Sequence, residues 1–411
     1  MSTSPVANVH RQIMVGFANT AVGFVIVCAF VWIIYQFSRT CYSYAWEAAK
    51  IYMRPDEDIP SHPSVVCSIG GTRGPQLGKK FTYKTGGAYL VELEDLYNKN
   101  VKRILSATNQ SFAITNRGVL YSFGVDNGGE LAQNIKNVRR EKQSLTGQCI
   151  YQPTIVNSVA GKKIIDISHH DGMFVAVSNE GRVFEWGRDL PLQRKYTSNV
   201  SLPSKIYKVY RSTESYALTN RGELYRWSGE NLLKLWQTQI RLCSFHKDYK
   251  LLLKQDGSIL IFHPGSTDYR TITELMGQEV KRVECGDGYF LALTESGTVY
   301  SWGNNFNYQL GLGDRMNRDF PTLIEGLSNL KVTKVGVTQD DNSYALTEDG
   351  DLYMWGRGFM RTFWYLLESD CSLPQKCKFL KDWIVTDISF GESHALVICK
   401  LVYVDDVVVG L

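Results

Sequence analysis

The sequence predicts an all-β domain built from repeated strand units and preceded by a single N-terminal transmembrane α-helix. Three observations predict this fold class: a strand-and-turn pattern that recurs along the chain, copies spaced tens of residues apart, and an uncharged apolar segment near the N-terminus. One such unit cannot bury both faces of its small sheet, whereas units stacked around an axis bury both and leave only short edges. Repeats of this size, carried by strands and turns, indicate a propeller or an array.

The most complete copy of the repeat lies in residues 280–314 and reads as three short strands separated by turns. Ser296-Gly297 supplies one tight turn, and Gly303-Asn304-Asn305 supplies another. The core of the repeat is an alanine, four residues, a glycine, two residues and an aromatic residue. Copies of this core, of which the fourth is weak and the last has Lys400 in the glycine place, begin at Ala113, Ala176, Ala217, Leu252, Ala292, Ala345 and Ala395.

Residues 290–313, FLALTESGTVYSWGNNFNYQLGLG, resemble the repeat of the regulator of chromosome condensation family almost throughout. The resemblance extends from about Ser64 to the C-terminus, and it is specific at residues 292–313 and 345–356. It implies a seven-bladed β-propeller. We therefore expect Trp186, Trp227, Trp302 and Trp355, which recur in the repeats, to pack between blades rather than stack on a ligand.

Both ends of the repeat region carry partial copies. Residues 66–70 followed by Gln76-Leu77-Gly78 repeat the register of residues 299–303 and 309–311, so the N-terminal end holds the back half of a repeat. The C-terminal end holds mainly a front half. Joining the two halves would close the ring with strands from both termini, although Leu401-Val402-Tyr403 could itself supply the missing strand.

A membrane span is predicted at the N-terminus. Residues 12–38 contain no charged side chain, and residues 13–37 would form a helix of ~37 Å, enough to cross a hydrocarbon layer of ~30 Å. A secretory signal peptide would have a shorter apolar core, and a buried core helix is the other alternative. We expect a short tail at 1–11, the transmembrane helix and its extension at 12–54, a linker at 55–63 that starts at the helix-breaking Pro55, and the propeller at 64–411.

Two surfaces are candidate contacts for partners. Gly16, Asn19, Thr20 and Gly23 fall on one face of the predicted span, where small residues let membrane helices pack closely. The alternative is that glycine and threonine are simply common in such spans. The second surface is an insertion whose basic residues could contact an acidic partner or a lipid headgroup, or could form a solvated loop: Lys136, Arg139, Arg140 and Lys142.

The sequence suggests no catalytic residue, no cofactor site and no metal site. Residues 74–80, GPQLGKK, lack the spacing and the Ser or Thr of a phosphate-binding loop. His169-His170-Asp171 is expected in a turn where neighbouring side chains diverge. The nine cysteines include no CxxC motif, which favours a reducing compartment over a disulfide framework. A net charge of +4 is too small to indicate nucleic-acid binding.

The resemblance implies two kinds of function: nucleotide exchange on the small GTPase Ran with chromatin binding, and scaffolding. Two features count against exchange. The chain begins with a predicted span, and the histidine of the family repeat is kept only at His394. Allowing a residue of slip, its place elsewhere holds Ser111, Phe174, Tyr216, Lys250, Phe290 and Tyr344.

The sequence therefore favours a membrane-anchored, non-catalytic propeller that acts as an accessory, scaffold or assembly subunit of a larger membrane complex. Its expected partners are other membrane protein subunits and the lipid bilayer. We favour the mitochondrial inner membrane, because the first 46 residues lack Asp and Glu, although another intracellular membrane is possible. The alternative is a membrane-tethered guanine-nucleotide exchange factor for a small GTPase.

Overall fold

The structure is a computed structural model. It describes residues 64–70, 77–78, 89–133, 148–188, 204–228, 231–236, 239–247, 249–264, 266, 268–338, 340, 342–357, 370–380, 383–400, 403–404 and 407–408. The chain divides into two compact units, of which Pro63–Lys400 is one, and Met1–His62 together with Leu401–Leu411 is the other. The predicted span and the linker lie outside the described residues. Within the described ranges, no helix has both the length and the apolar character needed to cross a membrane.

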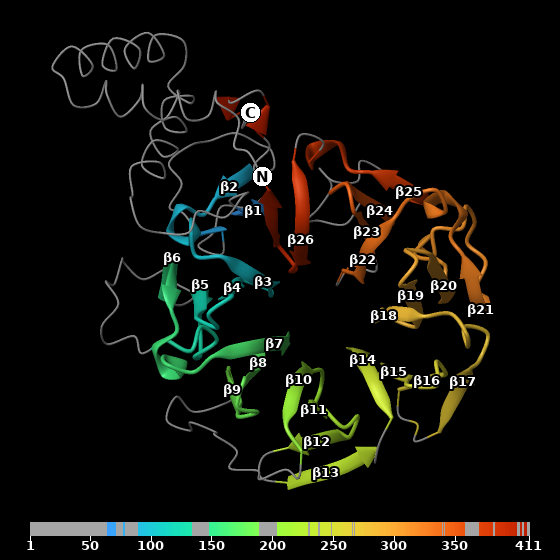
Figure 1. The fold of residues 1–411 in the computed structure, drawn as a ribbon, viewed down its shortest axis with the longest axis horizontal. Helices are drawn as coiled ribbons and strands as arrows, with labels where there is room; N and C mark the ends of the chain where they lie inside the picture. The colour runs from blue at the N-terminus through green and yellow to red at the C-terminus, as the bar shows by residue number, and fades with distance from the viewer. Residues whose placement is uncertain are drawn as a thin grey trace, which may run out of the picture. The chain divides into compact units, whose positions relative to one another are not determined.

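Unit Pro63–Lys400 is a seven-bladed β-propeller, with one antiparallel sheet per blade (Figure 1). In chain order the blades are blade 1 (β3–β6), blade 2 (β7–β9), blade 3 (β10–β13), blade 4 (β14–β17), blade 5 (β18–β21), blade 6 (β22–β25) and blade 7 (β26, β27, β1 and β2). The innermost strands are β3 (Val101–Ser106), β7 (Ile164–His170), β10 (Ile206–Arg211), β14 (Ile240–His246), β18 (Val280–Cys285), β22 (Val332–Val337) and β26 (Ile384–Phe390).

The remaining strands follow outward in each blade. The second strands are β4 (Gln110–Thr115), β8 (Met173–Ser178), β11 (Ser215–Thr219), β15 (Tyr249–Lys254), β19 (Tyr289–Thr294), β23 (Ser343–Thr347) and β27 (His394–Lys400). The third strands are β5 (Leu120–Asp126), β9 (Val183–Gly187), β12 (Leu224–Ser228), β16 (Ile259–Phe262), β20 (Val299–Gly303), β24 (Leu352–Gly356) and β1 (Ser64–Gly70). The outer strands are β6 (Gln148–Ile155), β13 (Asn231–Trp236), β17 (Tyr269–Ile272), β21 (Arg318–Leu323), β25 (Cys371–Lys376) and β2 (Tyr89–Glu92).

Short 3-10 helices and one small hairpin complete the described elements. The 3-10 helices are η2 (Glu94–Leu96), η4 (Asn157–Val159), η5 (Glu325–Leu327) and η6 (Lys378–Leu380). Each follows an outer strand and leads toward the innermost strand of the next blade. The hairpin pairs β28 (Tyr403–Val404) with β29 (Val407–Val408) and belongs to the other unit.

The repeated core forms the second strand of every blade, but the copy predicted to begin at Ala395 was placed two residues too early. Val397 takes the place of Ala292 in blade 7, since each lies three residues after the residue opposite the glycine of the third strand. In β4, β8 and β19 all the residues are buried, because each of these strands packs against a neighbouring blade on both faces. Ala113, Ala176 and Ala292 have no solvent exposure. The weak fourth copy still forms a four-stranded sheet, β14 to β17. The apolar pattern of the repeat therefore marks the layer where blades stack.

The ring closes in blade 7 with strands from both ends of the propeller unit, as the partial copies predicted. Strand β1 pairs antiparallel with β27 along its whole length, from Ser64 opposite Lys400 to Gly70 opposite His394. Leu77, from the N-terminal Gln-Leu-Gly, is buried, and its carbonyl accepts a 2.7 Å hydrogen bond from Ser68 Oγ. Closure therefore uses β1 rather than the segment around Tyr403.

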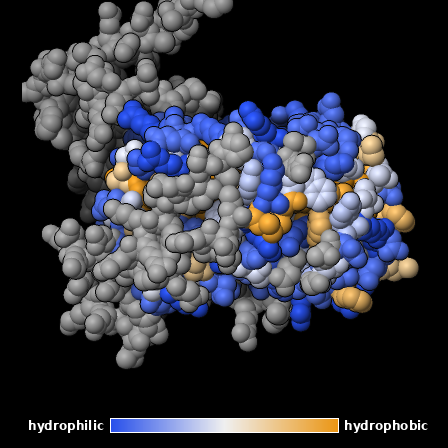
Figure 2. Space-filling model, turned by 90° about the horizontal axis from the view of Figure 1, so that it is seen from below, coloured by the Kyte–Doolittle hydropathy of each residue, from blue (hydrophilic) through white to orange (hydrophobic). Residues whose placement is uncertain are grey.

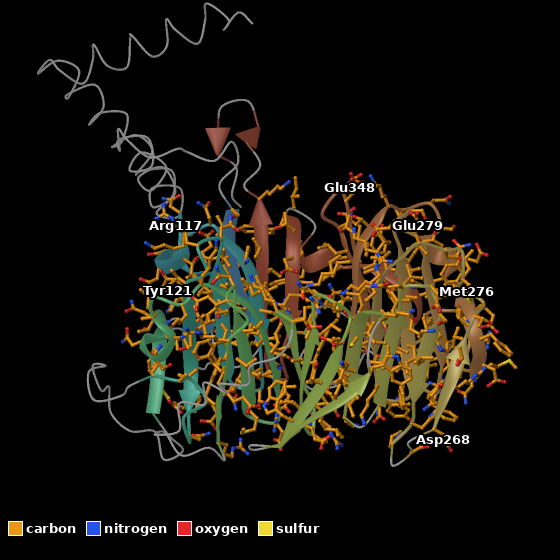
Figure 3. The ribbon with its side chains drawn as sticks, turned by 60° about the horizontal axis from the view of Figure 1, so that its bottom comes forward. Arg117, Tyr121, Asp268, Met276, Glu279 and Glu348 are labelled. Atoms are coloured by element: carbon orange, nitrogen blue, oxygen red, sulfur yellow. The ribbon has the colours of Figure 1, made fainter. Side chains whose placement is uncertain are left out.

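The two ends of the propeller can be told apart from the strand directions. We call the end at which the innermost strands begin the proximal end, and the other the distal end. The turn between the second and third strands returns to the proximal end: Asn179 N donates to Lys163 O at 2.7 Å, and Asn220 N donates to Lys205 O at 2.9 Å. Figure 3 shows Arg117, Glu279 and Glu348 at one end and Asp268 at the other.

These turns need glycine. Gly297 has a φ of +92°, and a Cβ atom there would lie 3.0 Å from Val332 N in the next blade. A positive φ costs little without a side chain. The turn glycine of one blade can therefore lie directly against the first residues of the next innermost strand.

Exposed large apolar residues are dispersed over the outer surface. Phe306 and Met316 are 67% and 68% exposed, and Arg270 lies over the exposed ring of Phe320 at 4.9 Å. The side shown in Figure 2 carries hydrophobic residues in small groups between hydrophilic ones. Small groups of this kind are normal for a protein surface.

Candidate functional site

A ring of charged residues surrounds the central axis of the propeller. Each innermost strand has a β-bulge after its first or second residue. Such a bulge redirects the side chain that follows it. The residues that immediately follow the bulge in the seven blades are Arg103, Asp166, Lys208, Leu242, Arg282, Lys334 and Asp387. The arrangement gives the axis a layer of charge.

Most of these charges pair across blade boundaries. The Arg103 guanidinium forms an ion pair with Asp166, and its Nη2 donates to Ile167 O at 3.3 Å. Asp166 Oδ2 accepts the Val209 N–H of blade 3 at 3.1 Å. The Lys334 ammonium pairs with Asp387 in the same way. Each pair therefore ties one innermost strand to the next.

Arg282 pairs within its own strand, since its Nε lies 2.5 Å from Glu284 Oε1. Lys208 differs, because no described residue lies within hydrogen-bond or ion-pair distance of its ammonium. Burial lowers the pKa of Lys208; Asp166 partly opposes this, and Arg103 and Arg282 add to it. Four cations thus face three carboxylates around the axis, which leaves one net positive charge. Two of the three ion pairs, Arg103 with Asp166 and Lys334 with Asp387, join neighbouring blades.

A buried histidine–serine contact joins the closing blade to blade 1. His394 Nε2 lies 2.6 Å from Ser111 Oγ, and neither residue is exposed. Burial, together with nearby His169, lowers the pKa of His394 to about 3. The neutral imidazole therefore takes part in blade packing and is not accessible to a substrate.

Strand register corrects the positions predicted to replace this histidine. His394 lies opposite Gly70, and Gln110, Met173 and Tyr289 lie opposite the equivalent glycines of blades 1, 2 and 5. The predicted positions Ser111, Phe174, Lys250 and Phe290 are one residue too late, within the allowed slip. The prediction was wrong by two residues for Tyr216 and Tyr344, because Ser215 and Ser343 pair with the tryptophans of their blades.

The recurring tryptophans pack between blades, as predicted. Trp186 Nε1 donates to Glu130 O of blade 1 at 2.8 Å, and its ring stacks on Phe174 at 5.8 Å. Trp355 Nε1 donates to Gln309 O of blade 5 at 2.9 Å. Trp227 and Trp302 join clusters of buried apolar residues that include the preceding blade.

The histidine pair that could suggest a metal lies in a strand, contrary to the predicted turn. His169 and His170 end β7, and Asp171 follows in the turn with a φ of +46°. Burial lowers the pKa of His169 to about 4. In the part of the chain that the structure describes, no group of three or more His, Cys, Asp or Glu side chains is placed to hold a metal ion.

Buried histidines predict acid sensitivity. Burial also lowers the pKa of His246 to about 4. The pKa values of His169, His246 and His394 in the folded state lie below the usual 6.5 of an unfolded chain, so the unfolded state binds more protons between about pH 6.5 and 4. Stability should therefore fall as the pH falls through this window, by at most about 1.4 kcal/mol per pH unit per histidine. Thermal unfolding measured against pH checks this, and His394→Gln should flatten the dependence. A melting temperature constant from pH 7 to 4 would contradict it.

The residues predicted to contact partners all lie outside the described residues. They are Gly16, Asn19, Thr20, Gly23, Lys136, Arg139, Arg140 and Lys142. The structure therefore leaves both predicted surfaces as predictions. The axial ring was not predicted, although a signal exists: a charge recurs two or three residues into six of the seven innermost strands.

Comparison with known sequences supports the repeat assignment. The Regulator of chromosome condensation (RCC1) repeat matches residues 296–339, and a second description of the same repeat matches residues 280–309. These matches fall on blades 5 and 6, where the copies are most complete. The chain is an RCC1-repeat seven-bladed β-propeller. Prp20p from Saccharomyces cerevisiae shares the fold, with a TM-score of 0.67 at 14% identity over 85% of this chain and 94% of that chain.

Other similar proteins vary widely in size. Human WBSCR16 has a TM-score of 0.62 at 15% identity, over 83% of this chain and 99% of its own. The human E3 ubiquitin-protein ligase HERC2 is 29% identical over 308 residues, 64% of this chain and 6% of that protein. The RCC1 domain-containing protein RUG3, mitochondrial, of Arabidopsis thaliana is 25% identical over 334 residues, 75% of this chain and 67% of that protein. Proteins with sequences similar to this chain thus differ widely in the share of their length that the similarity covers.

Proposed function

We propose that this RCC1-repeat propeller is a membrane-anchored, non-catalytic accessory or assembly subunit of a larger membrane protein complex. The observation that carries the proposal is the predicted span at residues 13–37, attached to a propeller whose ring is closed by its own terminal strands. A rigid ring on a single anchor is suited to holding partners at a membrane surface. The axial charges, which pair mainly with each other, also fit a structural role.

The mitochondrial inner membrane is the proposed location. Support comes from the absence of Asp and Glu in the first 46 residues and from the similarity to RUG3, a protein described as mitochondrial. The basic residues that flank the predicted span weakly favour the propeller on the electrically negative side of the membrane. Fractionation of mitochondria followed by protease protection would test both points.

The deciding experiment is extraction of the full-length chain in mild detergent, followed by quantitative mass spectrometry of what co-purifies. We expect a near-stoichiometric set of membrane subunits. The variant Gly16→Leu/Gly23→Leu keeps the predicted span apolar but blocks close helix packing, so it should lose these subunits. Recovery of the chain alone would overturn the proposal. Recovery with a small GTPase that leaves when nucleotide is added would favour the exchange-factor alternative.

A further inference from the structure

The proximal end of the propeller carries a one-sided distribution of charge. Blades 1 to 3 present five exposed basic residues there, which we call the basic arc: Lys102, Arg117, Lys163, Lys205 and Arg221. Within the described part of the chain, the charged groups of these five side chains have no hydrogen-bond or ion-pair partner. Nearby Glu180 is engaged by Arg182 at 3.1 Å. No described residue therefore competes with an external anion for the cations of the basic arc.

The members of the basic arc follow one another around the proximal end. A Cβ atom on Gly118, next to Arg117, would lie 2.5 Å from Lys163 Cγ of blade 2. A Cβ atom on Gly181 would likewise lie 3.3 Å from Lys205 Cγ of blade 3. The turn that carries Arg221 is bound to Lys205 through Asn220 N. The arc thus forms a continuous surface built from the ends of three adjacent blades.

Blades 4 to 6 have a different composition at the same end. Their proximal turns and strand starts carry five acidic residues, which we call the acidic arc: Asp256, Glu279, Glu295, Glu348 and Asp349. Several cations there are already paired, such as Lys254 with Asp256 at 2.7 Å and Lys331 with Glu348 at 2.8 Å. At the turn before the third strand, Arg117 and Arg221 on one side correspond to Asp256 and Asp349 on the other. The positions of Lys102 and Lys163 carry a cation on the acidic side as well, at Lys281 and Lys331, and Lys331 is paired with Glu348. An anionic surface would therefore be attracted more strongly to the side of the basic arc.

The chain also joins the propeller at this end. In blade 7, Ser64 lies opposite Lys400, and Lys400 lies opposite Ile384 at the start of β26. Blade 7 neighbours blade 1, since Ser106 N donates to Ser389 Oγ at 2.9 Å. The predicted linker at 55–63 reaches at most ~31 Å when extended. A membrane anchor preceding Ser64 would therefore keep a bilayer within reach of the basic arc.

We propose that the basic arc binds the phosphate headgroups of an anionic membrane surface. The proposal deepens the proposed function, since it assumes the same anchor. A lysine or arginine close to such a surface contributes about 1 kcal/mol, and the attraction decays within a Debye length of about 8 Å at physiological salt. Five cations on one rim are enough to tilt the propeller so that blades 1 to 3 face the bilayer. The distal loops then remain free for protein partners.

Lysine labelling of the full-length chain in vesicles tests the proposal. The chain is reconstituted in phosphatidylcholine alone or mixed with phosphatidylserine, and acetylation of each lysine is followed by mass spectrometry. Lys102, Lys163 and Lys205 should react several-fold more slowly in the anionic vesicles, and high salt should remove the difference. Lys281 is a matched control, because it occupies in β18 the same bulge position that Lys102 occupies in β3, but lies beside the acidic arc. Its reactivity should not change.

A charge-reversed variant gives a second measurement. Arg117→Glu/Lys205→Glu changes exposed side chains, so the propeller should keep its melting temperature while the protection of Lys102 and Lys163 disappears. Equal labelling of the wild-type chain in both vesicles would overturn the proposal. So would protection that appears only after co-purified proteins are added to the vesicles in a separate sample, because the arc would then bind an acidic protein. Since the vesicles contain no other subunit, the result is independent of the co-purification experiment.

Discussion

Replacing Trp355 with alanine is expected to lower the free energy of unfolding of the propeller by about 3–5 kcal/mol. The Trp355 side chain has no solvent exposure, and its Nε1 donates to Gln309 O of the preceding blade at 2.9 Å. Gly311 lies against the indole so closely that a Cβ atom there would be 2.7 Å from Nε1. The alanine variant would leave a cavity between blades 5 and 6. It would also remove one of the two hydrogen bonds that Gln309 O accepts, while the bond from Ser343 Oγ at 2.8 Å remains. Urea unfolding followed by tryptophan fluorescence measures the loss.

Trp355→Phe separates the two contributions. The phenyl ring fills most of the space but cannot donate to Gln309 O, which keeps its hydrogen bond from Ser343 Oγ. The expected loss is therefore nearer about 1–2 kcal/mol, the contribution of one buried hydrogen bond together with a small packing defect. A loss below about 1 kcal/mol in the alanine variant would show that the boundary between blades 5 and 6 rearranges without it. That result would contradict the view that the recurring tryptophans fix the spacing of blades.

The blade core and the ring closure could be predicted from the sequence because both are encoded locally. The alanine of each copy, or the apolar residue that replaces it in blades 4 and 7, is the point where blades stack. A short apolar strand bounded by turn residues identifies this point without any knowledge of neighbours. The closure of the ring could be predicted for the same reason. Residues Val66–Gly70 repeat the pattern of a third strand, and a third strand must pair with a second strand. Strand β27 provides that partner from the other end of the unit.

The axial ring could not be predicted in the same way, because it depends on β-bulges and on contacts between blades. Arg103 and its partner Asp166 are 63 residues apart, and a charge near the start of a strand usually indicates a solvated edge. A bulge adds one residue to one strand only, and no residue type marks it in these strands. The sequence also does not determine the exact register of a strand. For this reason the predicted position Tyr344 lies two residues after the position that is equivalent to His394.

Removing the charge of Lys334 is expected to cost about 3–5 kcal/mol, because it leaves the carboxylate of Asp387 without its counter-ion in a poorly solvated site. The two side chains are only 19% and 23% exposed, and Lys334 Nζ also donates to Ile388 O at 2.6 Å. Lys334→Met keeps much of the aliphatic volume, so the measured loss reports on charge more than on packing. Thermal and urea unfolding of this variant give its size.

Two further variants decide whether burial causes the effect. Lys334→Met/Asp387→Leu removes both charges, and replacing a whole buried pair by apolar groups is often neutral, so most of the lost stability should return. Lys331→Met breaks the pair with Glu348, whose side chains are 63% and 58% exposed, and should cost under about 1 kcal/mol. If the double variant were as unstable as Lys334→Met, the ammonium would act mainly through Ile388 O. If both single variants cost the same, the environment around the axis would be as well solvated as the rim.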